Sequence, residues 1–97
     1  MSKNKLEKLR RQITPTLKKH DVIRASVFGS YARGEETLKS DIDMMVEFSG
    51  KKSLLDLVGL KLDLEDKIGK KIDVSTFKAI HHLIRDRVFK EQVAILE

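Results

Sequence analysis

Residues 28–34 read Phe-Gly-Ser-Tyr-Ala-Arg-Gly, and residues 40–43 read Ser-Asp-Ile-Asp. The first stretch ends a run of β-branched and aromatic residues over 22–28, which predicts a strand that stops at a glycine. Ser30 can then cap a helical turn. The second stretch opens a segment over 41–48 in which apolar and polar residues alternate, as in a strand with one buried face. Together the two stretches predict two strands joined by a turn that carries polar residues.

Two carboxylates share one face of the second predicted strand. Asp41 and Asp43 are two positions apart, so the period of a strand projects their side chains side by side. Two such charges about 5 Å apart repel by roughly 1 kcal/mol in water, and by more near a desolvated surface. Packing does not explain this repulsion, whereas a hard divalent cation would offset it. Oxygen ligands without histidine or cysteine favour Mg²⁺ or Mn²⁺.

The turn before these carboxylates suits a phosphate group. Gly29 lets the backbone approach a ligand closely. A helical turn that opens at Ser30 presents free N–H groups and a positive dipole end to an anion. A metal site beside a phosphate-binding turn predicts a nucleoside triphosphate site.

The remaining segments predict helices around a small sheet. Pro15 should kink the first helix or split it at Thr14, and the leucine-rich helix in the middle of the chain is expected to be central and to end at Gly69. We expect an α/β (α+β) domain in which a small mixed β-sheet is flanked by helices. In chain order, the expected elements are a helix over 4–20, strands over 22–28 and 41–48, a helix over 53–68, a strand over 71–77 and a helix over 82–96.

Length, composition and charge limit the kind of protein. The 97 residues are expected to form one domain, 1–97. The absence of cysteine excludes disulfides, zinc–thiolate sites and cysteine nucleophiles. No signal-like or membrane-spanning run is present, so a cytoplasmic protein without membrane contact is expected. The net charge of +5 suits an anionic ligand, or a lysine-rich solvated surface. With 5% aromatic residues and no recognition-helix motif, direct nucleic-acid binding is not expected.

The two quoted stretches resemble a known signature. Residues 29–34 and 40–43 are similar to the pattern Gly-Ser-x-Ala-Arg-Gly … Ser-Asp-x-Asp of the DNA polymerase β-like nucleotidyltransferase superfamily. The short chain resembles the minimal nucleotidyltransferase (MNT) branch, whose members are often partnered with HEPN-domain proteins as antitoxin and toxin. The resemblance extends over nearly the whole chain and implies the polymerase β-like nucleotidyltransferase fold.

The resemblance also implies roles for individual residues. Asp41 and Asp43 would ligate two metal ions, Mg²⁺ or alternatively Mn²⁺, that hold the triphosphate. A third carboxylate is expected from a later strand, where this sequence offers Asp73. Alternation over 71–77 independently places Asp73 on the polar face of that strand, where it would complete the second metal site and help to activate the acceptor hydroxyl. The implied nucleotide-binding residues are Gly29, Ser30, Arg33 and Ser40. Arg33 would either add positive charge there or brace the loop, and the resemblance leaves that choice open.

The implied function is transfer of a nucleoside monophosphate, AMP from ATP, to a hydroxyl group with release of pyrophosphate. In the toxin–antitoxin setting of the family, the acceptor is a residue of a HEPN-type toxin, which the transfer neutralises. The alternative is an interaction protein that neutralises its partner by binding and turns over little nucleotide. The sequence leaves open the base of the nucleotide, the acceptor, and whether the chain forms a homo-oligomer.

Overall fold

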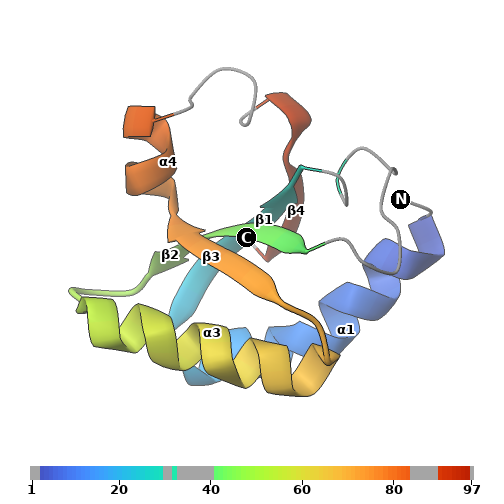
Figure 1. Ribbon diagram of the computed structural model, residues 1–97, viewed down its shortest axis with the longest axis horizontal. Coiled ribbons are helices and arrows are strands. Elements are labelled where there is room, and N and C mark those ends of the chain that lie inside the picture. Colours follow the sequence, from blue (N-terminus) through green and yellow to red (C-terminus); the bar gives the residue numbers. More distant parts are fainter. Residues whose placement is uncertain (1–2, 30–31, 33–40, 84–89, 97) are drawn as a thin grey trace.

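The computed structural model describes residues 3–29, 32, 41–83 and 90–96, arranged as helices around one sheet (Figure 1). All three predicted strands are present within one residue of their expected bounds, whereas the predicted turn at Ser30 lies outside the described residues. No helix in these ranges is long and apolar enough to cross a membrane. In chain order, the elements are α1 (Lys3–Lys19), β1 (Val22–Phe28), β2 (Ile42–Phe48), α3 (Leu54–Ile68), β3 (Ile72–Thr76), α4 (Phe77–Leu83) and β4 (Val93–Leu96).

The sheet is mixed, as expected. Its strand order is β3-β2-β1-β4. β1 runs antiparallel to both of its neighbours, whereas β2 and β3 are parallel. Parallel neighbours need a long crossover connection, and α3 provides it between β2 and β3. The α+β class with a mixed sheet flanked by helices is therefore confirmed.

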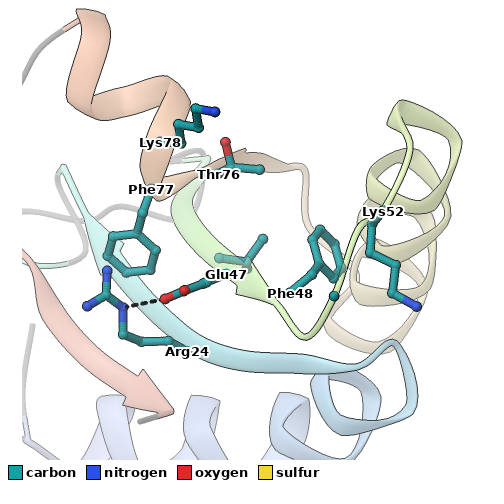
Figure 2. A pocket seen from close by; sticks show the side chains of 9 residues that line it. Arg24, Glu47, Phe48, Lys52, Thr76, Phe77 and Lys78 are labelled. Atoms are coloured by element: carbon teal, nitrogen blue, oxygen red, sulfur yellow. Dashed lines mark ion pairs between the residues drawn. The ribbon is translucent and has the colours of Figure 1, made fainter.

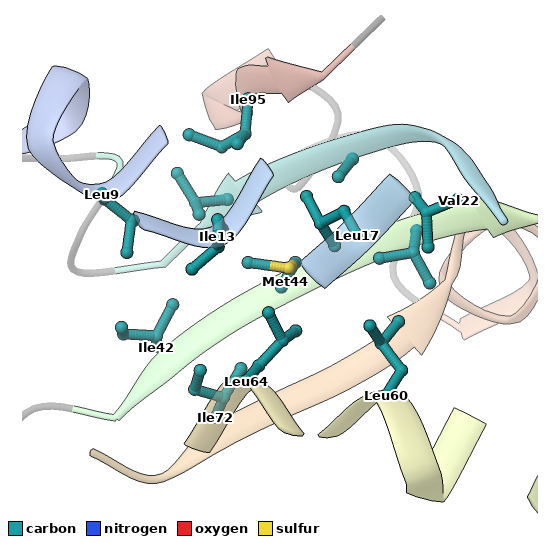
Figure 3. Close-up of a cluster of buried hydrophobic side chains, with 13 residues drawn as sticks. Leu9, Ile13, Leu17, Val22, Ile42, Met44, Leu60, Leu64, Ile72 and Ile95 are labelled. Carbon is teal, nitrogen blue, oxygen red and sulfur yellow. The ribbon is translucent and has the colours of Figure 1, made fainter. Parts of the chain in front are cut away.

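The main core lies between one face of the sheet and the helices α1 and α3 (Figure 3). Helix residues meet strand residues here because the buried side chains repeat every three to four positions in the helices and every second position in β2. On the opposite face, Met45 packs with Phe77 and Ile80 from the start of α4. The helices thus cover both faces, and α4 lies on the far side of the sheet from α1 and α3 (Figure 1). The main core includes Leu9, Ile13, Leu17, Ile42, Met44, Leu60, Leu64 and Ile72.

Helix α1 continues through Pro15, so the predicted split at Thr14 is wrong. A proline inside a helix removes one backbone donor and crowds the preceding turn. Leu9, Ile13 and Leu17 are all buried against the sheet, and burying a leucine or isoleucine side chain contributes about 1.5–3 kcal/mol. Packing along this stripe therefore outweighs the local cost of the proline.

Helix α3 is not central, contrary to the sequence-based expectation. Its N-terminus is closed by a capping box between Ser53 and Asp56, and its C-terminus by Gly69 at φ 75°, as predicted. Only Leu60 and Leu64 are buried along its length. The apolar residues of its outer face are exposed to solvent, and they are Leu54, Leu55, Val58 and Leu62.

The C-terminal segment is a strand, where a continuous helix over 82–96 was expected. α4 begins five residues earlier, at Phe77, and residues 93–96 form β4 at the edge of the sheet. β4 pairs with the free edge of β1, where Ser26 lies opposite Ala94. The side chain of Arg10 donates to the carbonyl oxygens of Ala94 (2.9 Å) and Ile95 (3.1 Å). These tertiary bonds override the helical spacing of the apolar residues.

Candidate active site

The candidate site is built where three strand ends meet. Asp43 on β2 lies opposite Asp73 on the parallel strand β3 and opposite Phe28 on the antiparallel strand β1. Side chains of directly paired residues point to the same face, and neighbouring strands lie about 4.8 Å apart. The sheet register thus places two predicted site carboxylates on adjacent strands, next to the end of β1.

Gly29 and Asp43 are in closer contact than the sequence suggested. Gly29 adopts φ +71°, a conformation that residues with a side chain rarely adopt, and a Cβ atom there would collide with Oδ2 of Asp43. The half-buried Asp43 carboxylate therefore uses the space that the missing side chain leaves. Gly29 was predicted to let a phosphate approach the backbone. In the structure it also admits the carboxylate of Asp43.

The other two carboxylates are exposed. Asp41 directly precedes β2, and Asp73 lies at the second position of β3. Among the described residues, no three or more side chains of histidine, cysteine, aspartate or glutamate are grouped closely enough to hold a metal ion. The structure brings Asp43 and Asp73 together by register, but it does not assemble the predicted set of three. Carboxylate oxygens at solvent-facing strand ends nevertheless suit a hard divalent cation.

Three of the predicted nucleotide-binding residues lie outside the described part of the chain. These are Ser30, Arg33 and Ser40. Their roles stay predictions, including the open choice for Arg33 between charge and bracing. Gly29 stands at the last described position before this segment, directly beside Asp43.

An apolar cluster supports the face of the sheet that carries the aspartates. Met45 lies two residues after Asp43 on β2, on the same face, and is fully buried under Phe77 and Ile80. Phe28, which is paired with Asp43, packs against the same cluster. The alternation of β2 placed Met45 on this face, but its burial depends on α4, whose start the sequence pattern located too late.

The same face carries a cavity at the opposite end of the strands, which sequence reasoning missed (Figure 2). It has a volume of about 330 Å³. The guanidinium of Arg24 lies 3.8 Å from the centre of the Phe77 ring, and its Nε is 3.4 Å from Oε1 of Glu47. Alternation along β1 could have placed Arg24 on this face, but only the tertiary fold adds the wall formed by Thr76, Phe77 and Lys78.

Comparison with known proteins identifies the family. The model of the family described as polymerase beta, nucleotidyltransferase matches residues 11–97. The chain belongs to this family of nucleotidyltransferases. The family match covers every element that carries the candidate site, from β1 to β3.

Two curated relatives of this nucleotidyltransferase have related names. A candidate protein adenylyltransferase of Methanocaldococcus jannaschii is 53% identical over 91 residues, which is 94% of this chain and 98% of the relative. The protein adenylyltransferase MntA of Thermococcus cleftensis is 36% identical over 69 residues, 71% of this chain and 70% of that protein. The first comparison spans nearly the full length of both chains.

Solved structures support the same fold. A structure described as a minimal nucleotidyltransferase is 33% identical, with a TM-score of 0.78 over 96% of this chain and 95% of the other. A second structure contains a tri-AMPylated Shewanella oneidensis HEPN toxin in complex with an MNT antitoxin. Its similarity has a TM-score of 0.71 at 15% identity, over 93% of this chain and 71% of the other, and shows a shared fold.

Proposed function

We propose that this nucleotidyltransferase moves AMP from ATP, with Mg²⁺, onto a side-chain hydroxyl of a HEPN-type toxin and thereby acts as an antitoxin. The observation that carries the proposal is the register of Asp43 with Asp73, beside the close approach at Gly29. A pair of carboxylates next to a backbone that admits close contact is the arrangement that a metal-bound triphosphate needs.

Binding of the nucleotide follows from the chain's own groups. Asp41, Asp43 and Asp73 would hold Mg²⁺, which supplies positive charge that offsets the charge of the triphosphate and of the leaving pyrophosphate. Ser30 and the backbone after Gly29 would hold the β- and γ-phosphates. A triphosphate held by these two groups would lie beside the starts of β2 and β3, where Asp43 is paired with Asp73.

The transfer step needs an acceptor oxygen and a place for its proton. The acceptor oxygen forms a bond to the α-phosphorus, while the bond between that phosphorus and its bridging oxygen to the β-phosphate breaks. Pyrophosphate leaves with the electron pair of the broken bond. The exposed carboxylate of Asp73 can accept the proton of the acceptor hydroxyl. The product is AMP esterified to the partner protein.

The names of related proteins support the choice of acceptor. The relative that covers almost the whole chain is named for protein adenylylation, and a neighbour with the same fold was solved with an AMPylated HEPN toxin.

The direct test is incubation of the pure chain with α-labelled ATP, Mg²⁺ and a HEPN-type protein encoded beside it. We expect label on the partner, and a decrease of about 100-fold when Asp43→Asn removes one ligand charge. Asp66→Asn, an exposed position on α3, is the matched control and should transfer normally. If Asp43→Asn binds and neutralises the partner as well as the unaltered chain does, the protein works by binding, and the transferase proposal is wrong.

A further inference from the structure

We propose that the outer edge of β3 binds an extended segment of the acceptor protein as an additional strand, with the hydroxyl-bearing residue opposite Asp73. The backbone groups of residues 72–76 that point away from β2 are called the β3 edge below. The identity of the protein that contributes the segment rests on the proposed function. Pairing of a strand with the β3 edge does not, because it requires neither nucleotide nor transfer of AMP.

The position of β3 leaves one side of its backbone unpaired. Among the strands that the structure describes, only β2 pairs with β3, which lies at one end of the sheet (Figure 1). The backbone N–H of Ile42 on β2 donates to the carbonyl oxygen of Lys71 at 3.1 Å. Backbone groups of successive residues in a strand point to opposite sides. The groups of Asp73 therefore face β2, whereas those of Ile72 and Val74 face outward.

The outward groups next to Asp73 are available to another strand. The N–H of Ile72 is already bonded, because it donates to Oε2 of Glu65 at 3.0 Å. The carbonyl oxygen of Ile72 and both backbone groups of Val74 bond to no other residue in the described part of the chain. Unpaired backbone groups at a strand edge favour pairing with another strand. An added strand would therefore be held on both sides of Asp73.

This pairing places the acceptor at the candidate active site. Asp73 is exposed and shares a sheet face with Asp43. An added strand lies about 4.8 Å from its neighbour, and directly opposite residues have Cβ atoms about 5 Å apart on the same face. A hydroxyl carried opposite Asp73 is then close enough to pass its proton to the carboxylate. The other outer edge of the sheet, that of β4, is separated from β3 by β1 and β2.

The added strand and the nucleotide would approach Asp73 from opposite sides. The proposed triphosphate site is next to Gly29 and Asp43, on the β1 side of Asp73. The β3 edge lies on the other side. Displacement at phosphorus needs the attacking oxygen and the leaving pyrophosphate in line, on opposite sides of the phosphorus atom. Binding of the acceptor at the β3 edge fits this requirement and leaves Asp73 between the two reactants.

A second copy of this chain fits the β3 edge less well than a segment of another protein. Antiparallel pairing of β3 with itself would bring two copies of Asp73 to the same face of one continuous sheet. Like charges on neighbouring strands disfavour such pairing. It would also cover the side from which an acceptor reaches Asp73. Self-association through β3 is therefore an alternative outcome of the test.

The test is amide hydrogen exchange of the ¹⁵N-labelled full chain, alone and bound to the HEPN-type protein encoded beside it, without nucleotide. In the free chain, we expect the amide of Val74 to exchange at least about ten-fold faster than those of Asp73 and Ser75, which face β2. In the complex, the amide of Val74 should slow at least about ten-fold. The amides of Asp73 and Ser75 are internal references and should change less.

A proline substitution removes the proposed contact at a single atom. The N–H of Val74 makes no bond to β2, so Val74→Pro costs the sheet no hydrogen bond. The dissociation constant for the HEPN-type protein, measured without nucleotide, should rise at least about ten-fold, with the affinity for MgATP unchanged. Val74 packs against the main core, and Val74→Ala is the matched control because it loses packing but keeps the N–H. Circular dichroism shows whether both variants are folded, and exchange in the unaltered chain decides the question if Val74→Pro is not.

Three results would overturn the inference. They are an amide of Val74 that exchanges equally fast in the complex, equal binding of the partner by folded Val74→Pro and Val74→Ala, and protection of Val74 that depends on the concentration of the free chain. The last result would assign the β3 edge to a second copy. If AMP is transferred but Val74 stays unprotected, the proposed function stands without this edge. If the partner protects Val74 but receives no AMP, the proposed function fails and the strand-binding edge stands. Absence of any complex would overturn both.

Discussion

At the scale of single residues, the site depends on a contact that has no counterpart in a linear motif. The sequence suggested Gly29 because a glycine lets a ligand approach the backbone. The structure adds a neighbour, because the carboxylate of Asp43 lies where the β-carbon of any other residue would be. Gly29 is thus required for two separate reasons, its positive φ and the space for Asp43.

Gly29→Ala tests the second reason against the first. We expect both Gly29→Ala and Gly69→Ala to lose about 1 kcal/mol of stability, since alanine is disfavoured at positive φ. Only Gly29→Ala should displace Asp43, and a shift of 1 Å near reacting groups can cost about 100-fold in rate. Gly69 is the matched control, because its φ is +75° and no atom lies within 4 Å of its added Cβ. Urea unfolding measures the loss of stability in each variant, and the AMP-transfer assay measures the loss of rate. Equal transfer by both variants would show that Asp43 tolerates the methyl group.

The site residues differ in how far the sequence could predict them. Asp43 and Asp73 follow from alternation within each strand, and the structure pairs them directly. Arg24 and Lys78 are isolated charges in the sequence, so nothing local marks them. They share a cavity only because β1, β3 and the start of α4 are brought together by the fold.

At the scale of elements, α3 shows the limit of hydrophobic patterning. Its two apolar stripes look equivalent in sequence, and the pattern predicted a central helix. The sheet offers one face to α1 and α3 together, so each helix buries one stripe. Leu60 is fully buried, whereas Leu55 is 81% exposed. Pattern alone identifies apolar stripes, but the number of layers decides which of them is covered.

A pair of leucine substitutions in this helix measures the difference. Leu60→Ala should lower the free energy of unfolding by about 2–5 kcal/mol, because it removes buried methyl groups and leaves a cavity. Leu55→Ala should change it by less than about 0.5 kcal/mol. Both substitutions keep a strong helix former, so helix propensity does not separate them. Urea denaturation measures both changes, with the same dependence of the unfolding free energy on urea concentration applied to each variant. A large loss at Leu55 would mean that a layer covers the outer face of α3.

The connection from α3 to β3 depends on one carboxylate. Oε2 of Glu65 accepts a hydrogen bond from the backbone N–H of Ile72 at 3.0 Å and lies 3.3 Å from Nζ of Lys61. These donors, the backbone N–H first, hold the pKa of Glu65 below its ordinary value of 4.5. Ile72 directly precedes Asp73, so this bond helps to hold the start of the strand that carries the site.

Acid titration should reveal this bond. Because the pKa of Glu65 is lower in the folded chain, its stabilisation is present above pH 4.5 and is lost as pH falls through the folded-state value. Glu65→Gln keeps the shape of the side chain without the charge. The unaltered chain should therefore be more stable than the variant at pH 6, by a margin that shrinks below pH 4.5. Urea unfolding midpoints, measured from pH 6 to below pH 4.5, give this difference in stability. Asp66→Asn serves as the control. A margin that is constant with pH would assign the effect of the variant to packing alone.

At the scale of the whole molecule, β4 covers the edge of the sheet that β1 would otherwise leave open. The apolar positions in 82–96 fit helical spacing, and this pattern predicted one helix over the whole range. β1 nevertheless presents a free edge, and unpaired backbone groups at a strand edge favour pairing with another strand. Ile95 from β4 reaches the main core, where it is 4% exposed. The first helix and the last strand are joined through Arg10, which no local pattern could have predicted.

Arg10→Met tests whether this long-range tie holds the edge strand. The substitution keeps an unbranched stem but removes the donors to the carbonyl oxygens of Ala94 and Ile95. We expect a loss of about 1–2 kcal/mol in the free energy of unfolding, since hydrogen bonds from a charged group are the stronger ones. Amide hydrogen exchange should accelerate most along β4. Arg11→Met, at an exposed neighbouring position, should leave both quantities unchanged. If β4 exchanges equally slowly in both variants, its pairing with β1 and the burial of Ile95 suffice to hold it, and Arg10 contributes little.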